Sequence, residues 1–85
     1  MLYQEIETCF AAIEKHLTAQ ELLEIKHASQ DDLYLCHFGI GMWIRNYLLL
    51  KDRKLYSMFV EEEIAHQDEM SFLIIKLFQQ YLLQK

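Results

Sequence analysis

The chain has 85 residues, of which 53% are hydrophobic, and a formal net charge of −5. This length allows one domain, over residues 1–85, and the negative charge disfavours direct binding to nucleic acid, which depends on Lys and Arg side chains that contact phosphates. Proline is absent and the two glycines are Gly39 and Gly41. With so few turn-forming residues, a sheet with tight hairpins is disfavoured, and an all-α fold is predicted.

The N-terminal part of the chain contains two helix signals. Apolar residues recur at the three-four spacing of one helical face from Leu2 to Leu17, which predicts a first helix there. Thr18 and Glu21 then form the pattern of a capping box, in which each side chain satisfies a free backbone N–H. A short second helix is therefore expected to begin after Thr18 and to end near His27.

The middle of the chain is its most apolar part. The segment Ser29–Asp32 has the composition of a loop and supplies the next helix cap. From Leu33 to Leu50 nearly every residue is apolar or aromatic, and a helix that is hydrophobic all round is one that other helices surround. The sequence thus predicts a compact bundle of about five helices around a central helix over residues 33–50, with its glycines allowing a neighbouring helix to approach closely.

The segment Leu33–Leu50 is also the one candidate for a membrane span. It contains Arg45, and an arginine at the centre of a bilayer costs about 2.5–3.5 kcal/mol, so a buried helix is the better interpretation. The N-terminus has no secretory signal. Cys9 and Cys36 lie among apolar neighbours and are interpreted as reduced core residues. A cytoplasmic protein is expected.

Two further helices are predicted in the C-terminal part. The polar segment Lys51–Lys54 precedes a short helix from Leu55 to about Glu62, which the run Glu61–Glu63 ends because carboxylates are unfavourable at the C-terminal pole of a helix dipole. The last helix is expected to begin between Gln67 and Met70 and to continue to the end of the chain.

Two Glu-x-x-His pairs raise the question of a metal site. Glu24 with His27, and Glu63 with His66, have the spacing used by di-iron bundle proteins. Those proteins take two more glutamates from other helices, yet residues 33–50 contain no carboxylate, so no metal and no cofactor are expected. Cys36 and its neighbour His37 point about 100° apart on a helix and cannot activate one another. No catalytic residue is predicted.

A polar stripe crosses the predicted central helix. His37, Gly41 and Arg45 are spaced four residues apart and lie on one helical face. A buried arginine must be paired, and replacing Arg45 with Ala is expected to cost several kcal/mol. The acceptors are expected at helix starts. The stripe then forms a structural network or, in the alternative, a polar pocket for a ligand. The expected acceptors are Asp31, Asp32, Asp68 and Ser71.

Two groups of residues are candidates for contact with a partner. Trp43, Tyr47 and Tyr34 are of the types that anchor protein interfaces, although such residues more often belong to a core. The run Glu61–Glu63 is either a solvated turn or a negative patch that faces a basic partner and speeds association.

A wider pattern resembles a known family. The pattern contains Asp31-Asp32-Leu33, then His37, Gly41 and Ile44-Arg45-Asn46, and finally Asp68-Glu69-Met70-Ser71. It is similar to that of a family of short, uncharacterised bacterial all-α domains, over roughly the last two-thirds of the chain. Members often have proline after the histidine that matches His66, where this chain has Gln67. The resemblance implies a bacterial origin and a shared role for His37, Arg45, Asn46, Asp68 and Ser71.

Two functions remain open from the sequence. The first is a small cytoplasmic interaction protein without catalytic activity, of the immunity or antitoxin type, that binds and neutralises a basic, nuclease-like toxin. The second is a small enzyme or ligand-binding domain that acts on nucleotides or nucleic acid through the stripe from His37 to Arg45. Because a core of this size cannot bury so many large apolar residues, a homodimer is also expected. Its predicted interface contains Leu2, Phe10, Phe78, Tyr81 and Leu82.

Overall fold

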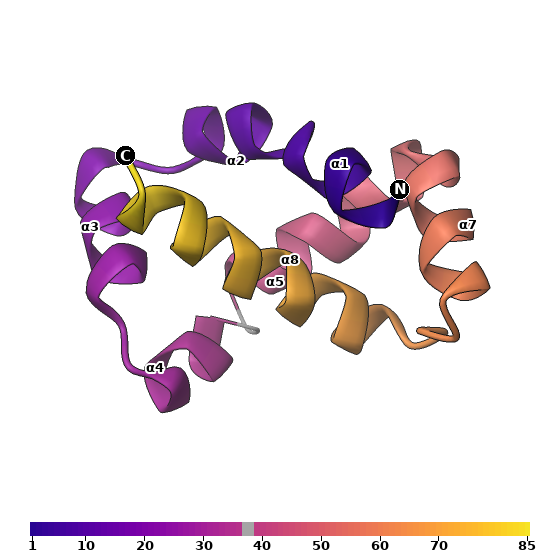
Figure 1. Ribbon diagram of the computed structural model, residues 1–85. Helices are drawn as coiled ribbons and strands as arrows, with labels where there is room; N and C mark the ends of the chain where they lie inside the picture. The colour runs from indigo at the N-terminus through magenta and orange to yellow at the C-terminus, as the bar shows by residue number, and fades with distance from the viewer. Residues whose placement is uncertain (37–38) are drawn as a thin grey trace.

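The structure, a computed structural model, describes residues 1–36 and 39–85; the predictions for His37 lie outside this part of the chain. The described residues form helices and connecting turns and contain no strand, so the all-α prediction is confirmed (Figure 1). In the same residues, no helix combines the length and apolar character needed to cross a bilayer. The elements are α1 (Leu2–Glu7), α2 (Phe10–His16), α3 (Ala19–His27), α4 (Gln30–Leu35), α5 (Ile40–Trp43), η2 (Ile44–Leu48), α6 (Leu49–Lys51), α7 (Arg53–Glu61) and α8 (Gln67–Leu83).

The first predicted helix is divided into α1 and α2 by a tight turn at Thr8 and Cys9. The Thr8 hydroxyl donates to the Glu5 carbonyl at 2.6 Å, and the Cys9 N–H donates to the Ile6 carbonyl at 2.9 Å, a three-residue step. A Thr side chain that bonds a carbonyl of the preceding turn commonly bends a helix. The bend places Cys9 and Phe10 in the core, where they are 5% and 3% exposed.

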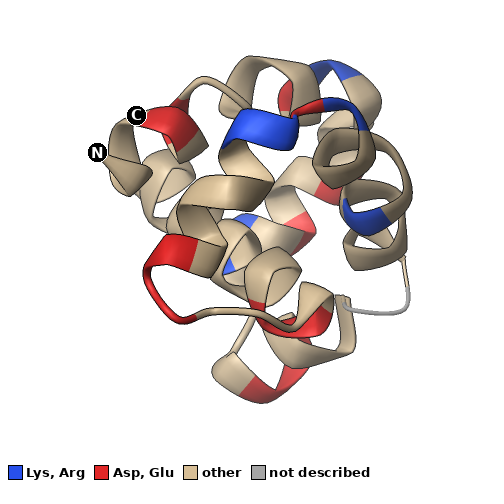
Figure 2. Ribbon diagram, turned by 90° about the vertical axis from the view of Figure 1, so that its right-hand side faces the viewer, with Lys and Arg blue, Asp and Glu red and all other residues tan. Residues whose placement is uncertain are grey.

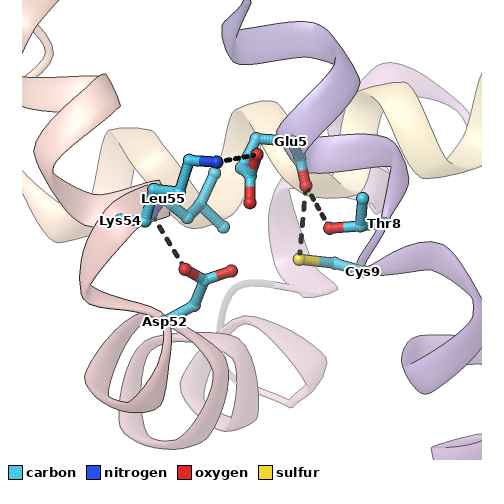
Figure 3. Close-up of polar contacts among 6 residues, drawn as sticks. All are labelled: Glu5, Thr8, Cys9, Asp52, Lys54 and Leu55. Atoms are coloured by element: carbon cyan, nitrogen blue, oxygen red, sulfur yellow. Dashed lines mark hydrogen bonds and ion pairs between the residues drawn. The ribbon is translucent and has the colours of Figure 1, made fainter.

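The start of α7 lies beside α1 and makes two polar contacts, one within its own first turn and one to α1 (Figure 3). The Asp52 carboxylate caps α7 by accepting from the Leu55 N–H at 3.0 Å. The Lys54 ammonium lies 3.5 Å from the Glu5 carboxylate, but its side chain is 74% exposed, so this ion pair contributes little. The cap fixes where α7 begins, two residues before the predicted Leu55.

Helix α3 follows the prediction closely. Thr18 accepts from the Glu21 N–H at 3.1 Å, and the Glu21 carboxylate accepts from the Thr18 N–H at 2.9 Å. This capping box is the one expected from the sequence, and α3 ends at His27 as predicted. Carbonyls at the end of α3 accept hydrogen bonds from another helix: the Gln79 side-chain amide of α8 donates to the carbonyls of Ile25 and Ala28, both at 2.9 Å.

The prediction of a single helix over residues 33–50 is wrong. Ser29 caps α4 by accepting from the Asp32 N–H at 3.1 Å, so the helix begins earlier than expected, and it ends at Leu35. The chain becomes helical again at Ile40, after Gly39. From there α5, η2 and α6 follow one another without a break as far as Lys51, and η2 is a π-helical turn.

The helix at the centre of the molecule is α8. Figure 1 shows α8 crossing the molecule, and it contacts α3, α4, α5 and η2. Leu55 and Phe59 of α7 are fully buried in the same core. The central position predicted for residues 33–50 therefore belongs to α8. The buried residues of α8 are Met70, Ser71, Ile74, Ile75, Phe78, Gln79 and Leu82.

Three of the five residues predicted for a homodimer interface are buried within the chain. Phe10 of α2 packs on α8, with its ring centroid 5.7 Å from that of Phe78 and 4.8 Å from that of Tyr81. Phe78 and Leu82 are 1% and 6% exposed. The two terminal parts of the chain thus cover Phe10, Phe78 and Leu82, whereas Leu2 and Tyr81 stay partly exposed. The homodimer itself stays a prediction.

Candidate functional site

The Arg45 side chain extends from η2 to the first turns of α8. Its Nη1 donates to the Ser71 hydroxyl at 3.0 Å, and its Nε lies 3.5 Å from an Asp68 carboxylate oxygen. The Ser71 hydroxyl in turn donates to the Asp68 carbonyl at 3.0 Å. The Arg45 side chain is 13% exposed and that of Asp68 is 71% exposed. We call these three residues the arginine cluster; it joins η2 to α8 and leaves only the Asp68 carboxylate open to solvent.

Gly41 makes room for this arrangement. A Cβ at Gly41 would lie 3.1 Å from Arg45 Nη1 and 3.7 Å from Ile75 of α8. Gly39 has no comparable crowding, since a Cβ there would meet only the Cys36 carbonyl at 4.0 Å among the described neighbours. The close approach predicted for the two glycines therefore occurs at Gly41.

Two other residues predicted for the polar network lie elsewhere. Asp32 is exposed in the first turn of α4, and Asn46 is exposed on η2, next to Arg45 in sequence but not part of the arginine cluster. Within the described chain, the structure brings together Arg45, Asp68 and Ser71 of the predicted set.

Trp43 and Tyr47 form a stack of rings. The Trp43 ring is half-buried and parallel to that of His16, with centroids 4.0 Å apart, and to that of Tyr47, 5.2 Å apart. The Lys51 ammonium lies 4.2 Å from the Tyr47 centroid and donates to its hydroxyl at 3.1 Å. The ring faces thus contact one another and Lys51, and the stack holds η2 against the end of α2.

The run Glu61–Glu63 forms a helix end that is unfavourable for stability. The Glu63 N–H donates to the Val60 carbonyl and the Ile64 N–H to the Phe59 carbonyl, both at 2.9 Å, which is the Schellman pattern. Glu63 occupies the left-handed position with a φ of 64°, where glycine is preferred. All three glutamates are exposed at the negative pole of α7.

The run Glu61–Glu63 is one of three acidic segments on the same side of the molecule. The others are the first turn of α4 and the first turn of α8, and Figure 2 shows all three in red along its lower side. No Lys or Arg occurs between Lys26 and Arg45 or between Lys54 and Lys76. We call this region the acidic end. Its exposed carboxylates belong to Asp31, Asp32, Glu61, Glu62, Glu63, Asp68 and Glu69.

Aromatic side chains interrupt the acidic end between α4 and α8. Tyr34 and Phe72 meet edge to face, with ring centroids 5.7 Å apart, and Tyr34 is 60% exposed. Together with Asp68 and Glu69 they line a shallow hollow of about 180 Å³. Rings beside carboxylates offer both cation–π and ionic contact to a Lys or Arg side chain.

The thiols are poor nucleophiles. Burial raises the pKa of Cys9, with a further contribution from Asp52. Burial likewise raises the pKa of Cys36, which Asp32 and Glu24 raise further. Both thiols therefore stay protonated at neutral pH, and neither has the depressed pKa of a catalytic cysteine.

The Glu-x-x-His pairs lie at helix ends. His27 is the last residue of α3 and His66 is the N-cap of α8, three residues after the left-handed Glu63. Among the described residues, no three His, Cys, Asp or Glu side chains are arranged to hold a metal ion.

Sequence reasoning missed several residues of this surface. Tyr34 was among the interface candidates, but Phe72 was not singled out. A signal for Phe72 existed, because it follows the acidic pair Asp68 and Glu69 by three residues, in a stretch that contains no Lys or Arg. Gln79 was also missed, and its signal was a polar residue on the apolar stripe of the last helix, eight residues after Ser71.

Comparison with known proteins gives one match. A family model described as Domain of unknown function (DUF6794) matches residues 4–82. No curated protein and no solved structure matches the chain. The matched range contains all of α2 to α7, the arginine cluster and the acidic end. The expectation of an uncharacterised family is confirmed, whereas the bacterial origin stays a prediction.

Proposed function

The chain belongs to the DUF6794 family, and we propose that it is a small cytoplasmic protein-binding domain of the immunity or antitoxin type, which covers a basic surface of its target with the acidic end. The proposal assigns no catalytic step to the chain. The target is a protein with a patch of Lys and Arg side chains, as in an enzyme that acts on nucleic acid.

The observation that carries this proposal is the helix end at Glu61–Glu63. Capping and helix dipoles explain acidic residues in the first turns of α4 and α8, because carboxylates are favourable there. No such benefit exists at the end of α7, where three carboxylates repel one another and one residue adopts a φ of 64°. Features that cost stability concentrate at functional sites.

The negative charge of the acidic end implies that the binding surface of the partner is positively charged. The acidic end has seven exposed carboxylates. Among the described residues, the Lys or Arg side chain that contacts them is that of Arg45, which is largely buried, and the exposed His66 lies between Glu63 and Asp68 in the chain. Such a field accelerates encounter with a basic partner more than it tightens the complex. The alternative function on nucleotides gains no support, since Arg45 engages Ser71 and Asp68 and its surroundings are negative.

Crosslinking in the native cell tests the proposal with two charge-matched double variants. Glu62→Gln/Glu69→Gln removes two charges from the acidic end, and Glu7→Gln/Glu24→Gln removes two exposed charges elsewhere. We expect the parent and the second variant to capture the same basic protein and the first variant to lose it. We also expect that protein to arrest growth when it is expressed alone, and the chain to restore growth.

We expect both variants to keep the fold. In the first variant, removal of Glu62 relieves repulsion at the end of α7 and removal of Glu69 loses a favourable charge in the first turn of α8, so its Tm should stay close to that of the parent. Capture that is equal for both variants, or a captured target with an acidic surface, would contradict the proposal.

A further inference from the structure

A second concave surface lies between α3 and the start of α5, and it is larger than the aromatic hollow at the acidic end. Its volume is about 540 Å³, which is within the range of small-molecule sites. Residues of α3, α4 and α5 and of the turns between them line it. It therefore opens at a place where helices diverge rather than where they pack.

The described lining divides into an apolar floor and an acidic rim. Leu17, Ile25 and Ile40 form the floor, and the last two are only 5% and 9% exposed. The rim has the carboxylates of Glu21, Glu24 and Asp32, all exposed. No Lys or Arg contributes to the described lining, and the one residue of it that can carry a positive charge is His27 at the end of α3. A ligand therefore meets an apolar surface and a negative field together.

Two of the three rim carboxylates, those of Glu21 and Glu24, accept hydrogen bonds. The Thr18 N–H holds the Glu21 carboxylate at 2.9 Å and lowers its pKa, so it stays ionised. Glu24 accepts from the Gln20 amide at 3.3 Å. The field also reaches the floor, because Glu24 and Asp32 both act on the Cys36 thiol that lines the same pocket.

We propose that this pocket binds an organic cation with an apolar body, such as an alkylammonium or arylalkylammonium compound. The body lies against Leu17, Ile25 and Ile40, and the ammonium group faces Glu24 and Asp32. An anion of the same shape is rejected by the rim, and a neutral analogue keeps only the apolar contact. The site shares Asp32 with the acidic end, but binding of the cation does not require the protein partner proposed there.

Three ligands of matched length test the proposal: hexylammonium, hexanol and hexanoate. Methyl NMR of the isotopically labelled full chain reports their binding, with Leu17, Ile25 and Ile40 as reporters and Ile74, fully buried in α8, as the reference. We expect saturable shifts of the reporter methyls with hexylammonium at millimolar concentration or below, weaker binding of hexanol and the weakest binding of hexanoate.

Variants separate charge from packing. Glu24→Gln/Asp32→Asn should weaken hexylammonium about three- to tenfold and leave hexanol unchanged, since two partly solvated charges are lost. Glu7→Gln/Glu62→Gln, which lies outside the pocket, should change neither ligand. Equal affinity for the three ligands, shifts away from the floor, or failure of hexylammonium to saturate would overturn the proposal. Loss of target capture by the acidic-end variant is a separate result and does not bear on these outcomes.

Discussion

Two polar residues on the buried face of α8, Ser71 and Gln79, join this helix to its neighbours in different ways. Gln79 is 8% exposed, and its neutral amide donates to two backbone carbonyls at the end of α3. Ser71 is fully buried, but its partner Arg45 also contacts the largely exposed carboxylate of Asp68. Water can replace the second kind of contact and not the first. The end of α8 near Gln79 is therefore closed and structural, whereas the end near Ser71 leads to the acidic surface.

The largest expected effect is that of Gln79→Leu. This substitution removes the amide donor from both carbonyls. The Ile25 carbonyl keeps the Ala28 N–H at 3.3 Å, whereas the part-buried Ala28 carbonyl loses this donor. A buried acceptor without a partner costs about 1–3 kcal/mol, and we expect a loss of about that size in the free energy of unfolding, measured by denaturant titration. Gln80→Leu, one position along and exposed, is the control and should change it by less than about 0.5 kcal/mol.

Arg45→Met should have a smaller effect. The Ser71 hydroxyl keeps its hydrogen bond to the Asp68 carbonyl, and water solvates the exposed Asp68 carboxylate in place of the Arg45 side chain. We expect a loss of about 1–2 kcal/mol, below the several kcal/mol that the sequence alone suggested. Asn46→Met on the exposed side of η2 is the control. A loss as large as that of Gln79→Leu would show that the two ends of α8 are equally closed.

The pH dependence of stability tests a third contact of α8, at its C-terminal end. Hydrogen bonds from Lys85 and from Tyr81 lower the pKa of Glu14. A carboxyl whose pKa is lowered by folding stabilises the protein above its unfolded pKa, and this contribution disappears as the pH falls through the folded pKa. Glu14→Gln should therefore lower the Tm by about 2–5 °C at pH 7. The difference between the two proteins should shrink below pH 4.5, the ordinary value. A difference that persists at pH 2.5 would rule out this cause.

The smallest effect, and the one of opposite sign, belongs to Glu63→Gly. Glycine adopts a φ of 64° without a Cβ penalty, and it is the preferred residue at this position of a Schellman turn. We expect a gain of about 0.5–1 kcal/mol in the free energy of unfolding. Glu62→Gly, at the preceding residue with a φ of −90°, should instead lose stability. A loss for Glu63→Gly as well would remove the argument that stability is sacrificed at this turn.

Local signals predicted local structure well. The capping box at Thr18 and Glu21 and the acidic stop at Glu61–Glu63 act within one turn, so the sequence carries them directly. What failed depended on contacts between distant segments. Apolar content alone suggested that residues 33–50 form the centre, but α8 has the more continuous buried face, and Gly39 begins a new helix.

The candidate site shows the same limit. The pairing of Arg45 with Asp68 and Ser71 was predictable from the rule that a buried charge needs partners. The sequence offers few acceptors beside its apolar segments, and Asp68 and Ser71 are two of them. The acidic end was visible only in part. Its first segment, Asp31 and Asp32, lies about 30 residues before the other two, and the fold alone decides that all three share one side.

The rate of association between the purified chain and its captured basic target, measured by stopped flow at a series of salt concentrations, tests the proposed function most directly. Steered encounter falls steeply with ionic strength. We predict that the parent rate constant falls by at least about tenfold between low and high salt, and that Glu62→Gln/Glu69→Gln begins lower with a shallower dependence. Glu7→Gln/Glu24→Gln should follow the parent. Identical salt dependence for all three proteins would contradict the assignment of the acidic end as the binding surface.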